Sequence, residues 1–274
     1  MNAHYELLAP LASGGPGVIF RARDAKTGQE VAIKRLRHAD AAADARLLRE
    51  AQCQARLRHP NIVSVLEAGV DEQGGYIVME LVHGETLEER IARGTLTTKE
   101  FDEFARQTLA GLAAAHEHGV LHLDLKPENL MISRQMGGEI QVKILDFGLA
   151  CDVHALEEGA GPELHRSLHG SIHFMAPEQF RRAAPDERTD LYALGCVFYH
   201  ALGGKRPFAG DTTPQVMVAH LYHRLEPLAT LRPDLPENLV SWIDRLMSLQ
   251  PARRPASAAA ALREFEELTR TTAG

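Results

Sequence analysis

Cysteine, basic charge and long apolar runs are all scarce in this sequence, and each scarcity excludes a class of protein. The three cysteines, Cys53, Cys151 and Cys196, are too widely spaced for a disulfide framework or a Cys-x-x-Cys metal site, which favours a reducing compartment. The formal net charge of −7 provides no basic surplus to displace the counterions of a nucleic acid. We therefore expect no nucleic-acid partner.

The sequence also lacks the hydrophobic patterns of a membrane or secreted protein. The most apolar stretch, LYALGCVFYHALGG at 191–204, is too short to cross a bilayer and suits a buried core helix. The N-terminal residues show no basic segment followed by an apolar one, so no signal peptide is predicted. A composition of 45% hydrophobic and 24% charged residues is typical of a soluble globular enzyme. We expect a cytoplasmic chain without a membrane segment.

Two kinds of secondary structure divide the chain. The first part reads as short strands rich in Val and Ile, with one helix at 40–57, and the second part reads as long helices. This order predicts an α+β fold of two lobes with a boundary near Glu80–Gly84. The predicted units are 1–83, 84–268 and a tail or linker at 269–274. Strands are expected at 5–12, 17–23, 29–36, 63–70, 75–81, 130–133 and 142–145, and further helices at 98–118, 189–203, 237–249 and 257–270.

Four separated motifs occur in one order along the chain. They are VAIK at 31–34, HLDLKPEN at 122–129, DFG at 146–148 and APE at 176–178. In this order and spacing the sequence resembles the eukaryotic-type (Hanks-type) protein kinase family, from about Tyr5 to Leu268. The phrases HPNIV, VMEL, MAPEQ and DLYALG most resemble bacterial serine/threonine kinases. The resemblance implies a small β-rich N-lobe with one long helix, a larger and mainly helical C-lobe, and the transfer of the ATP γ-phosphate to protein Ser or Thr hydroxyls.

The resemblance implies a role for each polar residue of these motifs. Lys34 would contact the α- and β-phosphates of ATP, held by Glu50 sixteen residues later, a spacing slightly shorter than expected. Asp124 would accept or orient the proton of the attacking hydroxyl. Lys126 would neutralise the γ-phosphate, and its position is typical of a serine/threonine kinase.

Two oxygen ligands complete the implied catalytic set. Asp146 would bind Mg²⁺, or alternatively Mn²⁺, and Asn129 would bind a second ion, because hard divalent cations prefer oxygen ligands.

The nucleotide site follows from the same resemblance. LASGGPGVIF at 11–20 matches the glycine loop, with Ala12 in place of the first glycine, and Pro16 removes one backbone donor from the loop tip. Met79 would be the gatekeeper, and Glu80 and Val82 would offer backbone groups to the adenine edge. The implied nucleotide-binding residues are Leu11, Ala12, Ser13, Gly14, Gly15, Gly17, Ile19, Ala32, Lys34, Met79, Glu80, Val82, Met131 and Asp146.

Other matches are structural or belong to the activation segment. Relatives usually carry arginine before the catalytic aspartate, where it pairs with a phosphorylated activation-segment residue, but this chain has Leu123. We therefore hypothesise that activity does not depend on phosphorylation of this segment. Its hydroxyl side chains between DFG and APE are Ser167 and Ser171. The implied structural residues are His122, Phe147, Gly148, Glu178, Asp190 and Arg254.

Two alternatives to a protein kinase are open to test. A pseudokinase, an ATP-binding scaffold without efficient transfer, is suggested by the altered glycine loop and by Leu123, although Lys34, Asp124, Asn129 and Asp146 are intact. A small-molecule kinase shares the His-x-Asp loop, but the features around APE and Arg254 count against it. The expected partners are ATP and protein substrates, with the chain a monomer or weak homodimer. Glu85 and Glu128 would favour basic residues near the acceptor hydroxyl, or else lie on a solvated surface.

Overall fold

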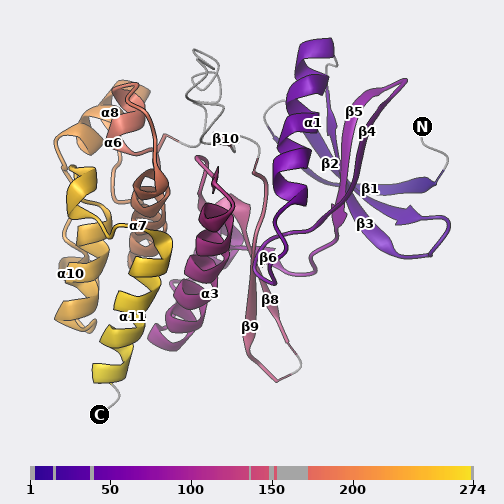
Figure 1. Cartoon of the computed structure of the whole chain (residues 1–274). Helices are drawn as coiled ribbons and strands as arrows, with labels where there is room; N and C mark the ends of the chain where they lie inside the picture. The colour runs from indigo at the N-terminus through magenta and orange to yellow at the C-terminus, as the bar shows by residue number, and fades with distance from the viewer. Residues whose placement is uncertain are drawn as a thin grey trace.

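The computed structural model describes residues 4–14, 17–37, 40–135, 137–147, 151–152 and 172–272. It confirms the predicted α+β fold, with a smaller lobe made of a β-sheet and α1 and a larger lobe that is mainly helical (Figure 1). None of the helices in these ranges has the length and apolar character needed to span a membrane.

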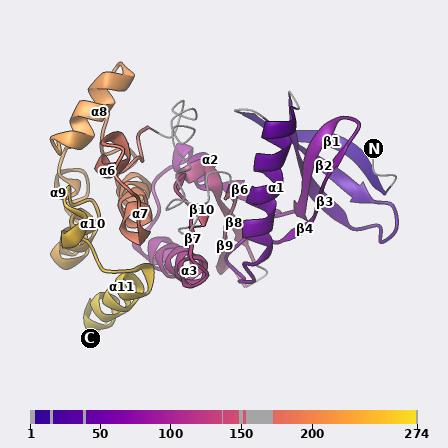
Figure 2. The ribbon, with the colours of Figure 1, turned by 45° about the horizontal axis from the view of Figure 1, so that its top comes forward.

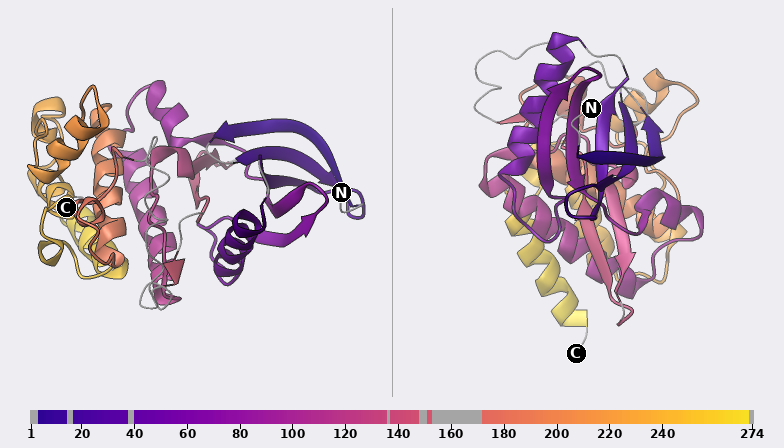
Figure 3. Two further views of the ribbon diagram at one scale, coloured as in Figure 1. Left: turned by 90° about the horizontal axis from the view of Figure 1, so that it is seen from above. Right: turned by 90° about the vertical axis from the view of Figure 1, so that its right-hand side faces the viewer.

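The smaller lobe is an antiparallel five-stranded sheet in the order β1-β2-β3-β5-β4, seen from its outer side in Figure 3. Residues on one side of the strands, among them Val31, Ile33 and Val78, form one small core, and residues on the other side pack against α1 (Ala41–Ala55) through Leu47 and Ala51. The alternation expected of a strand therefore gives the sheet two apolar faces. The strands are β1 (Tyr5–Gly14), β2 (Gly17–Asp24), β3 (Glu30–Leu36), β4 (Val65–Asp71) and β5 (Gly74–Glu80).

The larger lobe is built around one buried helix, α7 (Glu187–Gly203). Every residue from Thr189 to Leu202 is buried, as predicted for the apolar stretch in this region. The helices α3 (Thr98–Glu117), α10 (Glu237–Leu246) and α11 (Ala258–Thr272) pack around it (Figure 2). The shorter helices are α2 (Leu87–Ala92), α6 (Pro177–Phe180), α8 (Thr213–Leu221) and α9 (Leu228–Leu231).

Short strands line the side of the larger lobe that meets the smaller one. The pair β8 (Leu130–Arg134) and β9 (Ile140–Ile144) forms a hairpin that runs alongside α3, and the QMGGE sequence lies at its turn. β6 (Glu85–Thr86) adds to β8, and β7 (Val120–Leu121) pairs with β10 (Cys151–Asp152). The HLDLKPEN sequence at 122–129 lies between β7 and β8 and includes a 3-10 turn at Pro127–Asn129.

Several predicted helix ends differ from those observed. The first helix, expected over 40–57, spans Ala41–Ala55. The helix expected from 189 begins at Glu187, because Asp186 caps it through the backbone N–H of Arg188. The helix expected to reach 249 ends at Leu246, and the Ser248 carbonyl beyond it accepts a hydrogen bond from Arg254 Nε instead. The last helix continues past 270 to Thr272, since nothing in TRTT breaks a helix.

Four helices were not predicted: α2, α6, α8 and α9. Of these, α2 and α8 begin with a capping box, formed by Thr86 with Glu89 and by Thr212 with Gln215. The spacing Thr-x-x-Glu or Thr-x-x-Gln is the sequence signal that identifies such a helix start.

A buried ion pair joins α6 to the turn that precedes α11. Arg254 donates two hydrogen bonds to the Glu178 carboxylate, at 2.6 and 2.9 Å, and its side chain has no exposed surface. Its guanidinium also donates to the carbonyls of Ser248 and Arg188 and lies 4.8 Å from the ring centroid of Tyr192. The pair is thus satisfied on every side, and loss of either partner leaves the other buried without a counter-charge.

We expect Arg254→Leu to lower the free energy of unfolding by about 3–5 kcal/mol, because it leaves the Glu178 carboxylate buried and unpaired. Arg21→Ala is the matched control, since Arg21 pairs with Glu30 at 2.7 Å on an exposed surface, where solvent screens the pair and its loss costs much less than that of a buried pair. Chemical denaturation of both variants measures the difference. Equal losses for the two variants would contradict the prediction.

Candidate functional site

A lysine and two carboxylates meet where the two lobes touch. Lys34 Nζ on β3 lies 2.6 Å from Glu50 Oε1 on α1 and 2.7 Å from Asp146 Oδ1, just after β9. The spacing of sixteen residues therefore still brings Glu50 to Lys34. Leu145, the neighbour of Asp146, packs into the apolar core under α1. One lysine thus connects the sheet, its helix and the larger lobe.

Burial and charge act against each other in this triad. Burial would lower the pKa of Lys34, but the charges of Asp146 and Glu50 outweigh it and raise that pKa above its ordinary value. Burial raises the pKa of Glu50 to about 7, with Lys34 opposing and the charge of Asp146 adding to the rise. Burial also opposes ionisation of Asp146, but Lys34 and hydrogen bonds hold its pKa near 2. Lys34 and Asp146 are therefore both ionised at neutral pH.

Three polar side chains converge in the loop at 122–129. Lys126 Nζ donates to Asp124 Oδ2 at 2.6 Å, and Asn129 Nδ2 donates to the Asp124 carbonyl at 2.8 Å. The Asn129 amide also lies 3.4 Å from Asp124 Oδ2. These bonds fix the position of the Asp124 carboxylate, which is half-buried.

The Asp190 carboxylate on α7 supports this loop from below. It accepts hydrogen bonds from the backbone N–H groups of His122 and Leu123, both at 2.8 Å, and from His116 Nε2 at 2.9 Å. Leu123 has φ of 61°, in the left-handed region, which costs a non-glycine residue about 1–2 kcal/mol. The two bonds to Asp190 offset that cost and hold the loop in its turn.

His122 links the loop to the DFG motif. Its Nδ1 accepts from the Asp124 backbone N–H at 3.2 Å, so its Nε2 carries the proton that it donates to the Leu145 carbonyl at 3.0 Å. Its ring lies 4.7 Å from that of Phe147, which is fully buried. The loop at 122–129 and the segment that follows β9 are therefore packed directly on one another.

Several of the implied nucleotide-binding residues share one face of the smaller sheet. Ile19 lies opposite Lys34, and Ala32 lies opposite Met79. Lys34 and Ala32 are two residues apart, so all four side chains are on the same face. Val82 packs against the core that contains Met79, and Met131 lies half-buried on β8. Leu11 on β1 is half exposed and Ala12 lies opposite Ile19.

Glu80 is fixed at the end of β5. Its carboxylate accepts from the backbone N–H of Ser64 at 2.8 Å and from Lys143 Nζ at 2.7 Å. Its own backbone N–H donates to the Ser64 carbonyl at 3.0 Å. These contacts join the end of β5, which is expected to meet adenine, to Ser64 in the smaller lobe and to Lys143 in the larger lobe.

The glycine loop is described in part. The backbones of Ser13 and Gly14 end β1, and Gly17 opens β2 opposite Gly14. A Cβ at Gly17 would come within 2.8 Å of the Arg35 carbonyl, so this position requires glycine. Gly15, Pro16, Gly148, Ser167 and Ser171 lie outside the described residues.

The oxygen donors of Asp146 and Asn129 fit a hard divalent cation. The Leu145 N–H donates to the Asn129 carbonyl at 2.8 Å, which places Asn129 beside the residue that precedes Asp146. Its side-chain N–H group is used on Asp124, which leaves the amide oxygen as an acceptor. In the described ranges no group of three or more His, Cys, Asp or Glu residues forms a metal site. Substrate phosphates and water would therefore supply most of the coordination.

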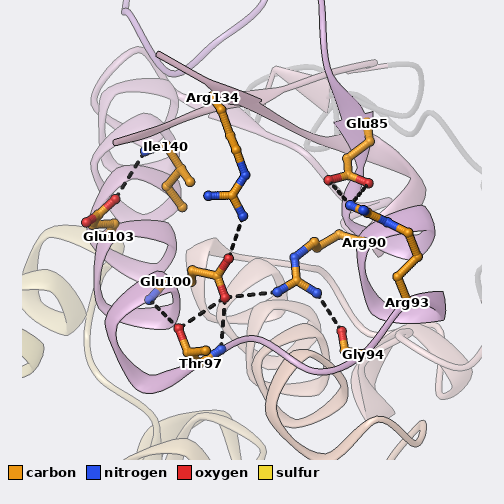
Figure 4. Close-up of polar contacts among 9 residues, drawn as sticks. All are labelled: Glu85, Arg90, Arg93, Gly94, Thr97, Glu100, Glu103, Arg134 and Ile140. Carbon is orange, nitrogen blue, oxygen red and sulfur yellow. Dashed lines mark hydrogen bonds and ion pairs between the residues drawn. The ribbon is translucent and has the colours of Figure 1, made fainter. Parts of the chain in front are cut away.

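Glu85, expected either to favour basic residues of the substrate or to lie on a solvated surface, is paired with an arginine of this chain. Arg93 donates to both of its carboxylate oxygens at 2.5 Å (Figure 4). Next to it, Glu100 accepts from Arg90 at 2.9 Å and from Arg134 at 2.7 Å, which joins α2, α3 and β8. Glu128 is exposed beside the catalytic loop.

Two contacts of the site were not predicted from the sequence. His116 is buried and forms ion pairs with Asp190 and, at 3.6 Å, with Glu187. The sequence held a signal for this contact. A histidine shortly before the His-x-Asp loop lies close to the residue that supports the loop, which is Asp190. Gln179, whose amide donates to the Leu123 carbonyl at 3.3 Å, had no such signal.

Comparisons with known proteins agree with this geometry. A family model described as the protein kinase domain matches residues 5–265. The chain is 37% identical to the serine/threonine-protein kinase pkn3 of Myxococcus xanthus, over 96% of this chain and 49% of that protein. It is 35% identical to the serine/threonine-protein kinase PrkC of Bacillus subtilis (strain 168), over 93% of this chain and 39% of that protein. The chain thus spans half or less of the length of these relatives.

The buried histidine predicts a pH-dependent stability. Burial opposes protonation of His116, but the hydrogen bond to Asp190 and the negative charges of Asp190 and Glu187 raise its pKa to about 9. The stabilisation that protonated His116 provides is fully present below the unfolded-state pKa of about 6.5. It is lost as the pH rises through 9. We expect the wild type to lose up to about 3 kcal/mol of unfolding free energy over this range relative to His116→Gln, which cannot become charged.

Denaturation at closely spaced pH values measures this loss. His118→Gln is the control, because His118 is exposed and two residues away; its pH profile should match the wild type. Parallel profiles for the wild type and His116→Gln would show that His116 is uncharged in the folded protein.

Proposed function

Because the chain belongs to the protein kinase family, we propose that it is a serine/threonine protein kinase that transfers the ATP γ-phosphate to protein Ser or Thr hydroxyls. The observation that carries this proposal is the assembled contact of Lys34 with Glu50 and Asp146, at 2.6 and 2.7 Å. A scaffold that does not catalyse phosphoryl transfer needs neither this triad nor a fixed Asp124 carboxylate, whereas a kinase needs both. Since ATP is the donor, we further propose that the chain acts in the cytoplasm.

Each polar group has one task in the proposed reaction. Lys34, held by Glu50, would contact the α- and β-phosphates and orient the γ-phosphate for in-line attack. Asp124 would accept a hydrogen bond from the substrate hydroxyl and take its proton as the bond to phosphorus forms. Lys126, 2.6 Å from Asp124, would stabilise the charge on the transferring phosphoryl group.

Asp146 and Asn129 are proposed to hold magnesium. The ion would supply charge neutralisation for the phosphate oxygens when bound. The role of the chain is to hold the two oxygen ligands beside Lys34. The packing of Leu145 in the core under α1 and the bond from its N–H to the Asn129 carbonyl do this.

We propose that activity does not require phosphorylation of the activation segment. Leu123 replaces the arginine through which relatives sense that phosphate, and its side chain is 6% exposed. The turn at Leu123 is instead held by Asp190 and by Gln179, through its backbone N–H and carbonyl. These contacts exist without a phosphate, which supports a loop that is ordered in the unphosphorylated chain.

Asp124→Asn should reduce phosphoryl transfer by about 10²- to 10⁴-fold, because it removes the proton acceptor while the shape of the side chain is kept. Transfer of label from γ-labelled ATP to the chain itself and to a general protein substrate measures the rate. Asp234→Asn is the matched control, since Asp234 lies on the surface and pairs with Arg232. A wild type no faster than Asp124→Asn, with ATP still bound, would identify a pseudokinase.

Phosphatase treatment and Ser167→Ala should each leave the transfer rate unchanged, because Leu123 offers no charge to a phosphate on this segment. The measurement compares both proteins before and after phosphatase treatment. A large loss of activity in the treated wild type, reproduced by Ser167→Ala, would show that phosphorylation of Ser167 activates the enzyme.

A further inference from the structure

A second pocket lies in the larger lobe, away from the Lys34 triad. Its volume is about 940 Å³, and it lies between the segment before α6, the connection from α7 to α8, and the chain that follows α8. α6 and α8 lie together at one end of this lobe (Figures 1 and 2). The side chains that matter for its chemistry are His173, Lys205, Arg206, Arg224 and Glu226.

The pocket is close to the catalytic loop. His173 lines the pocket, and its Nδ1 lies 3.0 Å from the carbonyl of Phe208, the residue between the lining residues Pro207 and Ala209. Six residues later, the amide of Gln179 donates to the Leu123 carbonyl, next to Asp124. The short segment from 172 to 179 therefore has the pocket on one side and the catalytic loop on the other.

Buried contacts support the backbone around the pocket. Phe208, next to the lining residues Pro207 and Ala209, is fully buried, stacked on Tyr192 at 6.1 Å and packed against the His220 ring at 4.2 Å. The Tyr199 hydroxyl donates to the Glu226 carbonyl at 2.6 Å, which joins two lining residues.

The lining of the pocket is positively charged. Three cations, Lys205, Arg206 and Arg224, face one carboxylate, Glu226. Lys205 pairs with Glu226 at 3.2 Å on an exposed surface, and Arg206 reaches Glu88 only at 3.4 Å. Arg224 is exposed, lies 5.4 Å from the ring centroid of Tyr222, and forms no ion pair with any described residue. The pocket thus holds cationic donors whose charge is not balanced within it.

A preference for basic residues of the substrate is weakened at Glu85, which lies outside the pocket. Glu85 was expected to attract basic residues, but Arg93 occupies both of its carboxylate oxygens. Glu128 remains exposed and free to favour a basic residue close to the acceptor. The charges around the loop are therefore arranged for a substrate that carries an acidic group toward the pocket.

We propose that this pocket binds a carboxylate side chain of the protein substrate, close to the acceptor hydroxyl, with Arg224 as its main contact. The proposal rests on the proposed kinase function and adds a substrate class to it. An aspartate or glutamate would be held by hydrogen bonds with Arg224, assisted by charge, with Lys205 and Arg206 adding to the positive field. Because these groups are partly exposed, their effect is on the binding of the substrate and not on the chemical step.

The test uses serine peptides that differ at one position at a time, with Glu, Ala or Lys placed at each of several positions on either side of the acceptor. We expect one position at which Glu raises kcat/KM about two- to fivefold over Ala, through KM. In Arg224→Glu this preference should reverse, with Lys favoured over Glu at that position by a similar factor. Arg263→Glu, the same charge change on exposed α11, is the control and should keep the preference of the wild type.

Each other outcome has a definite meaning. Equal kcat/KM for all peptides, or a Glu preference that survives in Arg224→Glu, would overturn the proposed pocket while leaving the kinase function intact. A gain with phosphoserine at that position but none with Glu would also overturn it, in favour of a site for phosphorylated substrates. If no peptide is phosphorylated faster by the wild type than by Asp124→Asn, the proposed kinase function itself fails.

Discussion

The catalytic loop is held by one fully buried carboxylate, that of Asp190, which accepts hydrogen bonds from the N–H groups of His122 and Leu123. A carboxylate in the interior is costly unless its charge is balanced, and His116 provides that balance at 2.9 Å. The left-handed turn at Leu123 depends on these bonds. The positions of Asp124 and Asn129 depend on that turn. The proposed transfer of a proton from the substrate to Asp124 therefore depends on it as well.

The second constraint lies between the lobes. Lys34, Glu50 and Asp146 come from a strand, a helix and the segment after a hairpin, and each is placed by the apolar core beneath it. Burial raises the pKa of Glu50 to about 7, while Asp146 stays ionised. The triad therefore carries one lasting ion pair and one carboxylate whose charge depends on pH. Nucleotide phosphates would enter a site that is already strongly polarised around Lys34.

The sequence predicted most of the fold and most of the residues of the site. The strands of the smaller lobe, the long helices and the buried apolar helix were found because periodicity and apolar content are local properties. The roles of Lys34, Asp124, Asn129 and Asp146 were taken from the order of four motifs. The helices α2 and α8 were missed, since they are short and their capping boxes are weaker signals than a long amphipathic pattern.

By itself the sequence determined the two-lobed α+β fold, the family and the chemical groups available for phosphoryl transfer. Only the tertiary structure decided which charges are balanced. It paired His116 with Asp190 and Glu85 with Arg93, and it placed the exposed Arg224 in a pocket of the larger lobe, where it forms no ion pair with any described residue. The physical reason is that the energy of a charge depends on distance and burial, and both are set by residues far apart in the chain.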